Sequence, residues 1–229
     1  MKKNIAYITL ILLLLICEIF AYMEEQVLYH AFWVNFIRIL SWITFGIWYF
    51  HAEKERFKRI QKIFLISNLL PIFATLSFYF FTLNEGLNLS YSINIVIFLL
   101  WIYVFRLMGA RIVFKKEDDF FKKSIPIFFI FPIAYYFLTL HPILTSSYGI
   151  FNLIFILTIS YACLLSIFLP INQDIKLFIT FGIVLFISIS LLFSNYLFIE
   201  KKMLSYVISR IVVVVTRCMI IYGMINYNK

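Results

Sequence analysis

Apolar residues along this chain come in long unbroken runs, and most charged residues gather in the short segments between the runs. A helix of about 20 apolar residues, rising about 1.5 Å per residue, is long enough to cross the hydrocarbon core of a membrane. The pattern predicts eight such helices, and the short links make consecutive helices antiparallel neighbours. The predicted spans are 4–22, 27–50, 63–83, 92–113, 125–140, 148–170, 177–198 and 204–226.

The composition agrees with this pattern. Of the 229 residues, 64% are hydrophobic and only 14% are charged. Runs of this kind, without a period of two or of three to four, exclude a soluble globular domain. We therefore expect one domain over residues 1–229, an all-α polytopic transmembrane bundle of about eight helices.

The net charge of +9 comes largely from residues at one end of the predicted helices. The N-terminus and the second and fourth links are basic, whereas the first, third and fifth links contain no Lys or Arg. This bias predicts that both termini are cytoplasmic. We expect a multi-pass protein of a cell membrane, the bacterial inner membrane, with membrane lipids rather than nucleic acid as partners. The basic residues that decide the orientation are Lys2, Lys3, Lys54, Arg56, Lys58, Arg59, Lys62, Lys115, Lys116, Lys122 and Lys123.

Two arginines lie deep inside predicted spans and are the main candidates for function. Arg38 is midway along the second span, and Arg217 is midway along the eighth. A charge at mid-membrane costs about 3 kcal/mol or more, so both should face the protein interior. Glu18 lies near the outer end of the first span, from which its side chain can reach water. We therefore expect no carboxylate partner at the depth of the two arginines.

The last two spans form a hairpin around the charged link 200–202. In an antiparallel hairpin, residues at equal distance from the link lie at equal depth. This register places Arg217 beside Leu185, and Arg210 beside Leu192, between Ser190 and Ser194 in depth. Two interpretations stay open for the deep arginines. They bind carbonyls, hydroxyls such as that of Ser190 or a water-filled notch, or they line an anion pocket, because a planar guanidinium suits a phosphate.

The anion-pocket hypothesis names four residues for one polar cavity that accepts an anionic headgroup: Arg217, Arg210, Arg38 and Ser190. Asn35, Ser41 and Trp42 share a helix face with Arg38 and predict a polar inward stripe along the second span. The three histidines show no spacing of three or four residues, so we expect no metal site and no cofactor.

Several residues of the last hairpin follow a family pattern. Gly182 and Phe186 lie four apart in the seventh span, and Met219, Ile220 and Gly223 lie in the eighth. In these residues and in its helix number and order, the chain resembles the YhhN/TMEM86 family, eight-helix membrane proteins that include lysoplasmalogenases. The resemblance implies an eight-helix fold with a pocket at mid-depth for a lysophospholipid.

The chain departs from the family pattern where the family carries acids and a histidine. Pro71 and Ser190 stand at the two acid positions, Ile102 stands at the histidine position, and Thr216-Arg217 replace Ala-Gln. Hydrolysis of a vinyl ether needs a proton donor and an activated water, usually supplied by carboxylates or His. We therefore expect hydrolysis of lysoplasmalogen to be weak or absent.

Three classes of function stay open. One is a lysoplasmalogenase-like hydrolase, which acts on a lysophospholipid or ether lipid. The second is a non-catalytic lipid-binding or structural membrane protein. A small transporter ranks last, because the chain shows no internal repeat of the kind that transporters are built from.

Overall fold

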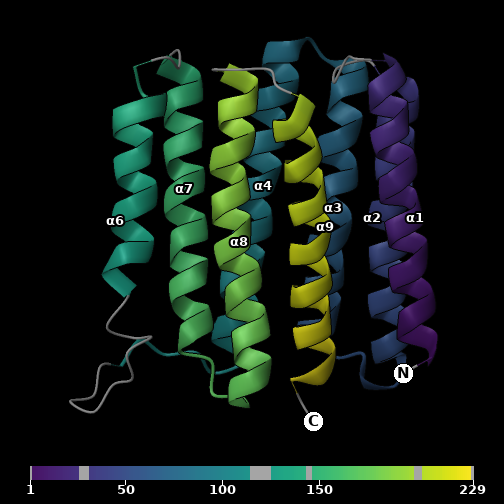
Figure 1. Ribbon diagram of the computed structural model, residues 1–229. Helices are drawn as coiled ribbons and strands as arrows, with labels where there is room; N and C mark the ends of the chain where they lie inside the picture. The colour runs from purple at the N-terminus through teal and green to yellow at the C-terminus, as the bar shows by residue number, and fades with distance from the viewer. Residues whose placement is uncertain (1, 26–30, 114–124, 143–145, 199–202, 228–229) are drawn as a thin grey trace. The chain divides into compact units, whose positions relative to one another are not determined.

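The computed structural model describes residues 2–25, 31–113, 125–142, 146–198 and 203–227, and this part of the chain contains helices and no strand (Figure 1). The all-α prediction is therefore confirmed, with eight α-helices in the described residues. A short 3-10 turn (Lys54–Arg56) follows α2, and a π turn (Tyr136–Leu140) continues α6. The helices are α1 (Lys2–Glu25), α2 (Phe32–Glu53), α3 (Arg59–Phe80), α4 (Leu83–Leu107), α6 (Ile125–Tyr135), α7 (Ser146–Ile167), α8 (Gln173–Phe198) and α9 (Met203–Asn226).

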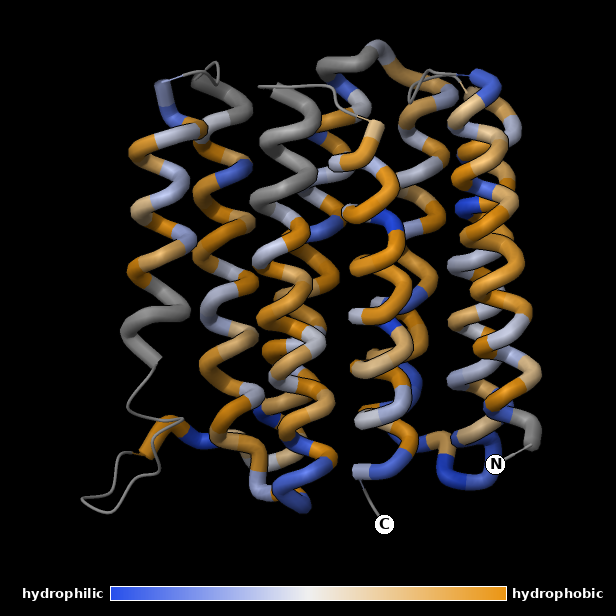
Figure 2. The backbone as a smooth tube through the Cα atoms, viewed as in Figure 1, coloured by the Kyte–Doolittle hydropathy of each residue, from blue (hydrophilic) through white to orange (hydrophobic). Residues whose placement is uncertain are grey.

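Six of these helices, α1, α3, α4, α7, α8 and α9, are long and apolar enough to cross a membrane. Apolar residues dominate along the helices in Figure 2, and hydrophilic residues cluster at the link between α2 and α3. The length and composition of these helices are those of a membrane protein. α2 is as long as the six but carries Arg38 and several Trp and Tyr residues, and α6 is shorter. That these two helices also cross the membrane stays a prediction, as does the cytoplasmic side of the termini.

Contacts divide the chain into two compact units, Met1–Ile97 and Phe98–Lys229, and the division falls within α4. In the first unit α1 packs against α2, and α2 against α3. In the second unit α6, α7, α8 and α9 pack one against the next in chain order (Figure 1). The single domain over residues 1–229 stays a prediction.

Close packing and polar contacts between helices stabilise the first unit. Gly46 allows α2 and α3 to approach, because a Cβ there would come within 2.6 Å of Cδ2 of Leu69. Nearby, the rings of Tyr49 and Phe64 meet edge to face at 4.8 Å. The indole Nε1 of Trp48 in α2 donates to Asn4 Oδ1 in α1 at 3.2 Å.

Two glycines set the contact between α8 and α9 in the second unit. A Cβ on Gly182 would lie 2.6 Å from Ile220 Cγ1, and a Cβ on Gly223 would clash with Ile179 Cγ1. Residues 182 and 220 each lie 19 positions from residue 201, and residues 179 and 223 each lie 22 positions from it. The predicted register of the last hairpin is therefore confirmed. Small residues at such a contact let two helix backbones pack closely inside a membrane.

The predicted boundary between the third and fourth spans is wrong. α3 ends at Phe80 and α4 begins at Leu83, so all of the predicted polar loop, residues 84–91, is helix. The Thr82 hydroxyl and backbone N–H both donate to Glu85 Oε2, at 2.8 and 3.2 Å, and this contact caps the helix start. Within the helix, Ser92 and Asn94 donate to carbonyls four residues earlier, so their polar side chains are satisfied without a loop.

Both α4 and α7 end earlier than predicted. α4 stops at Leu107, close to Gly109, whose φ of 93° lies in the left-handed region that favours glycine. α7 stops at Ile167 and is followed by turn hydrogen bonds rather than by three more helical residues before Pro170. The predicted basic fourth link and the hairpin link 200–202 lie outside the described residues.

Candidate functional site

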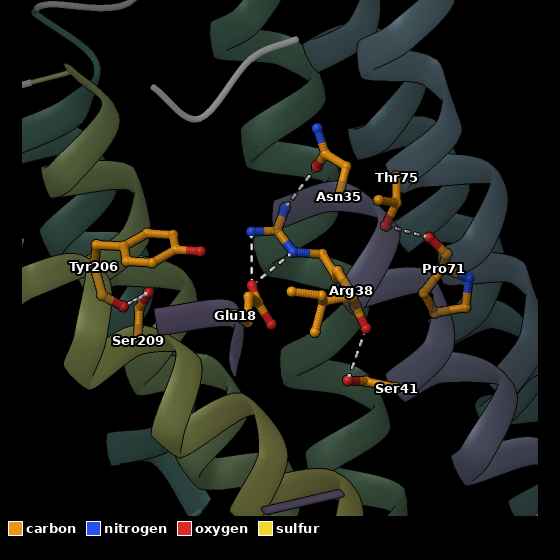
Figure 3. A network of polar contacts seen from close by, with 9 residues as sticks. Glu18, Asn35, Arg38, Ser41, Pro71, Thr75, Tyr206 and Ser209 are labelled. Carbon is orange, nitrogen blue, oxygen red and sulfur yellow. Dashed lines mark hydrogen bonds and ion pairs between the residues drawn. The ribbon is translucent and has the colours of Figure 1, made fainter. Parts of the chain in front are cut away.

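A buried ion pair joins α1 and α2 in the first unit (Figure 3). Nε and Nη2 of Arg38 donate to the same oxygen of Glu18, Oε1, at 3.0 and 2.9 Å. The Glu18 side chain is only 1% exposed. Two expectations are therefore wrong: Glu18 does not extend to the membrane surface, and Arg38 does have a carboxylate at its depth. The pair forms because burial of either charge alone would cost far more than burial of both together.

The sequence holds a signal for this pair that the interpretation above missed. Glu18 and Arg38 each lie ten positions from residue 28, the middle of the link between α1 and α2. The counting rule that gave the register of the last hairpin therefore places the two side chains at equal depth. At the other end of the same helices, the Tyr7 hydroxyl lies 3.2 Å from His51 Nδ1, as expected for antiparallel neighbours.

The polar stripe predicted on α2 is confirmed, and it supports the ion pair. Asn35, Arg38, Ser41 and Trp42 are all buried. Nη1 of Arg38 donates to Asn35 Oδ1 at 3.4 Å, and the Ser41 hydroxyl donates to the carbonyl of Ile37 at 3.1 Å. The charge of Arg38 is thus matched by one carboxylate and one amide oxygen within the first unit.

Polar side chains of α3 serve the backbone around Pro71. The helix runs through this proline, and the Thr75 hydroxyl donates to the Pro71 carbonyl at 2.9 Å (Figure 3). One turn earlier, Ser67 and Asn68 both donate to the Phe64 carbonyl, at 2.7 and 2.8 Å. These three bonds satisfy the polar side chains of α3 within the helix itself. An internal proline is tolerated in membrane helices, and no acidic side chain stands at position 71.

The second unit holds the other deep arginine, Arg217, in its core. This side chain on α9 is 1% exposed. Its guanidinium carbon lies over the ring of Trp101 at 4.9 Å from the centroid, and over the ring of Phe186 at 5.5 Å. Trp101 comes from α4 and Phe186 from α8, so three helices meet at this cation. The negative faces of aromatic rings stabilise a desolvated cation by about 2 kcal/mol or more.

Further aromatic rings extend this site. Phe98 on α4 meets Trp101, Phe155 and Phe186 edge to face, with centroids 5.0, 5.7 and 5.2 Å away. All four rings are buried. Arg217 is therefore a buried cation at the edge of an apolar aromatic cluster, formed by Phe98, Trp101, Phe155 and Phe186. The sequence predicted the depth at which Arg217 of α9 meets α8, one residue from Phe186, but gave no sign of the α4 and α7 rings.

The other predicted site residues are distributed as follows. Arg210 on α9 is buried, and so is Ser209 beside it, whose hydroxyl donates to the Tyr206 carbonyl at 2.7 Å (Figure 3). Ser190 on α8 is half-buried, and its hydroxyl donates to the Phe186 carbonyl at 2.7 Å. Arg217, Arg210 and Ser190 belong to the second unit, whereas Arg38 belongs to the first. A single cavity lined by all four residues stays a prediction.

The chemical groups near the buried charges can be given for the described residues. Within the described ranges, no group of three or more His, Cys, Asp and Glu side chains could hold a metal ion. Glu18 is a buried carboxylate, but its Oε1 accepts two hydrogen bonds from Arg38. Hydroxyls that donate to helix carbonyls, such as those of Ser190 and Thr75, are ordinary helix contacts rather than activated nucleophiles. The arrangement is suited to holding charge inside a membrane and less suited to proton transfer.

Comparison of the chain with known protein families, curated proteins and solved structures finds no match. The resemblance to the YhhN/TMEM86 family therefore stays a prediction based on the residues of the last hairpin. Function has to be argued from the buried charges and rings described above.

Proposed function

We propose that this protein is a YhhN-like membrane protein that binds an anionic lysophospholipid or ether lipid without hydrolysing it. The observation that carries the proposal is Arg217, a buried cation whose guanidinium lies over Trp101 and Phe186. An ionisable residue deep in a membrane helix is costly, and such residues usually mark a functional site. Guanidinium is also the side-chain group best matched to the oxygens of a phosphate.

Cation–π contact and anion binding use different features of one guanidinium. The rings attract the positive charge through their π faces, whereas an anion accepts hydrogen bonds from N–H groups in the guanidinium plane. Trp101 and Phe186 can therefore hold the cation in place while it engages a headgroup. The buried aromatic cluster beside it, with Phe98 and Phe155, makes the surroundings of this cation apolar. A hydrogen bond from the guanidinium to a phosphate is stronger in such surroundings than in water.

The described contacts favour binding over catalysis. The three positions where the family carries acids and a histidine hold Pro71, Ser190 and Ile102. Pro71 belongs to a continuous helix, and the Ser190 hydroxyl donates to a backbone carbonyl. General acid–base hydrolysis requires groups that exchange protons with substrate and water, and these side chains supply none.

A hydrolase is the second candidate, and one observation favours it. Glu18 is a carboxylate buried in the first unit, which the sequence interpretation had placed at the membrane surface. If hydrolysis occurs, a proton and hydroxide from water add across the vinyl ether, and the resulting hemiacetal splits into an aldehyde and the glycerol alcohol of the lipid. Glu18 and Glu53 are both buried acids, and only Glu18 lies within a predicted span, so Glu18 is the candidate for the proton transfer. Aldehyde release by the purified protein that is lost in Glu18→Gln would replace binding by catalysis as the function. If neither lipid binding nor aldehyde release is found, the protein has a structural role that does not involve a bound lipid.

The binding proposal is tested by thermal unfolding in lipid nanodiscs, with and without added lysophospholipid. We expect the lipid to raise Tm of the wild type, and Arg217→Leu to remove this shift while the protein still inserts and folds. Folding should survive, because exchange of a buried charge for an apolar side chain is often neutral or stabilising. Arg217→Lys keeps the charge and should retain part of the shift.

Two controls make the result specific. A neutral monoacylglycerol with the same chain should give a smaller shift in the wild type, because it lacks the phosphate. The variant Arg38→Leu with Glu18→Leu removes the buried arginine of the first unit together with its partner. An unchanged shift would confine the site to the second unit, and a lost shift would support the predicted cavity that includes Arg38. Equal shifts in wild type and Arg217→Leu would disprove the role of Arg217.

A further inference from the structure

The link between α2 and α3 concentrates positive charge at one end of the first unit. Residues 54–62 contain five basic residues and one acidic residue, Glu55, a net charge of +4. The five side chains are all exposed. We call them the basic surface: Lys54, Arg56, Lys58, Arg59 and Lys62. Hydrophilic residues dominate this link in Figure 2.

The basic surface is carried by a short link with defined contacts, not by a long free loop. The 3-10 turn Lys54–Arg56 follows α2 directly, and α3 begins at Arg59. Phe57 folds back on α2, where its ring meets that of Phe50 at 5.3 Å. The Lys58 backbone N–H donates to the Arg56 carbonyl at 2.8 Å and lies 3.2 Å from Gln61 Oε1. The cations are therefore presented together.

The N-terminus of α3 carries basic side chains, whereas acidic side chains stabilise the N-terminus of a helix. Its first turn contains no acidic residue, and Lys58, Arg59 and Lys62 stand there instead. Exposed N–H groups make this end of a helix partly positive, so acidic side chains or anions normally stabilise it. The five cations and the helix start repel one another, and a bound anion would remove that repulsion.

The position of the basic surface along α3 indicates which anion lies close to it. α3 is one of the six helices long and apolar enough to cross a membrane, and the basic surface lies where its apolar stretch begins. Phe50, the ring against which Phe57 packs, is 43% exposed, as expected for a side chain that meets lipid. Phosphate groups of the adjoining leaflet therefore lie at the level of the five cations.

We propose that the basic surface binds phosphate groups of anionic phospholipids in the leaflet beside it. Lys and Arg at a membrane surface attract anionic headgroups, and several of them together bind such lipids selectively. The inference does not rest on the proposed function, because the residues belong to the first unit and Arg217 to the second. Loss of lysophospholipid binding in Arg217→Leu and loss of anionic lipid binding at the basic surface are separate results.

The test measures binding of fluorescent phosphatidylglycerol to the full-length protein in phosphatidylcholine nanodiscs. Wild type is compared with Lys58→Gln/Lys62→Gln, which removes two charges of the basic surface. We expect apparent affinity to fall roughly tenfold or more in the variant, and the wild-type affinity to fall at high salt. The matched control Arg111→Gln/Lys176→Gln removes two charges from the second unit and should bind like the wild type.

Further controls distinguish a loss of lipid binding from misfolding, and a phospholipid ligand from a free phosphate. Lys58→Arg/Lys62→Arg keeps both charges and should retain affinity. Labelling of a cysteine placed at position 81 shows whether the Gln variant keeps the wild-type topology. Soluble glycerol phosphate should compete only weakly; competition as strong as that of the lipid would identify a free phosphate as the ligand instead. Equal affinity in wild type and Lys58→Gln/Lys62→Gln, with topology intact, overturns the proposal.

Discussion

Glu18 on α1 and Arg38 on α2 form a buried ion pair in which one carboxylate oxygen accepts from both Nε and Nη2 of the guanidinium, at 3.0 and 2.9 Å. The pair links the first two helices inside the first unit, away from water. Asn35 Oδ1 accepts a third hydrogen bond from the same arginine at 3.4 Å. Burial of an unpaired arginine would cost free energy, but the paired Arg38 forms a specific contact between α1 and α2.

This pair predicts a large difference between single and double substitutions. Glu18→Leu alone should lower the free energy of unfolding by about 3 to 5 kcal/mol, because it leaves Arg38 as an uncompensated buried charge. Glu18→Leu with Arg38→Leu should be close to wild type or more stable, because no buried charge is left. Unfolding in mild detergent by heat or denaturant measures both. If the double variant is as unstable as the single variant, the pair contributes more than charge balance.

The glycines between α8 and α9 predict a steric effect. Gly182→Ala should destabilise the protein by about 1 to 3 kcal/mol, because the new Cβ would lie 2.6 Å from Ile220 Cγ1 and 3.3 Å from the Thr216 carbonyl oxygen. Adding Ile220→Ala should recover part of the loss by removing the clashing atoms. Thermal unfolding of the two variants is the measurement. A Gly182→Ala protein with wild-type stability would mean that α8 and α9 are not closely packed at this point.

The start of α4 predicts the effect of losing a helix cap. Thr82 donates to Glu85 Oε2 through both its hydroxyl and its backbone N–H. Thr82→Ala removes the hydroxyl bond and leaves the backbone N–H bond, so it should cost about 0.5 to 1 kcal/mol, the net value of one hydrogen bond, and Thr82→Ser should cost much less. Amide hydrogen exchange at residues 83–86 should be faster in Thr82→Ala. Unchanged exchange there would place the start of α4 elsewhere.

Topology is tested by cysteine labelling in a protein whose three native cysteines are replaced by Ser. Cysteines at Arg56 and at Phe81, both exposed and at opposite ends of α3, should react with membrane-impermeant reagent from opposite sides. The positive-inside rule predicts that position 56 and a reporter fused after Lys229 are cytoplasmic. Labelling of positions 56 and 81 from the same side would mean that α3 does not cross the membrane.

The sequence by itself determined the class of fold and much of its geometry. Long apolar runs can form only structures in which each backbone polar group is bonded within its own segment, so the eight helices follow from composition and length. Short links then fix antiparallel neighbours, and counting from residue 201 gives the contacts of Gly182 with Ile220 and of Gly223 with Ile179. The same count from residue 28 places Glu18 and Arg38 at equal depth. The depth of this pair could therefore be predicted from the sequence, although Glu18 was expected to reach the surface.

Only the tertiary structure decided what surrounds the deep arginines. Trp101 and Phe186 meet Arg217 from two other helices, and the rotation of each helix about its axis depends on packing with all its neighbours. In a chain so rich in Phe, Ile and Tyr, nearly every helix face is apolar, and no periodic pattern shows which face is inward. Hydrogen bonds between Thr82 and Glu85 cap the start of α4. The polar residues that follow them had predicted a loop, but they are helical in the structure. Depth along a helix is thus set by counting residues, whereas the direction of a side chain around the helix is set by the neighbours against which it packs.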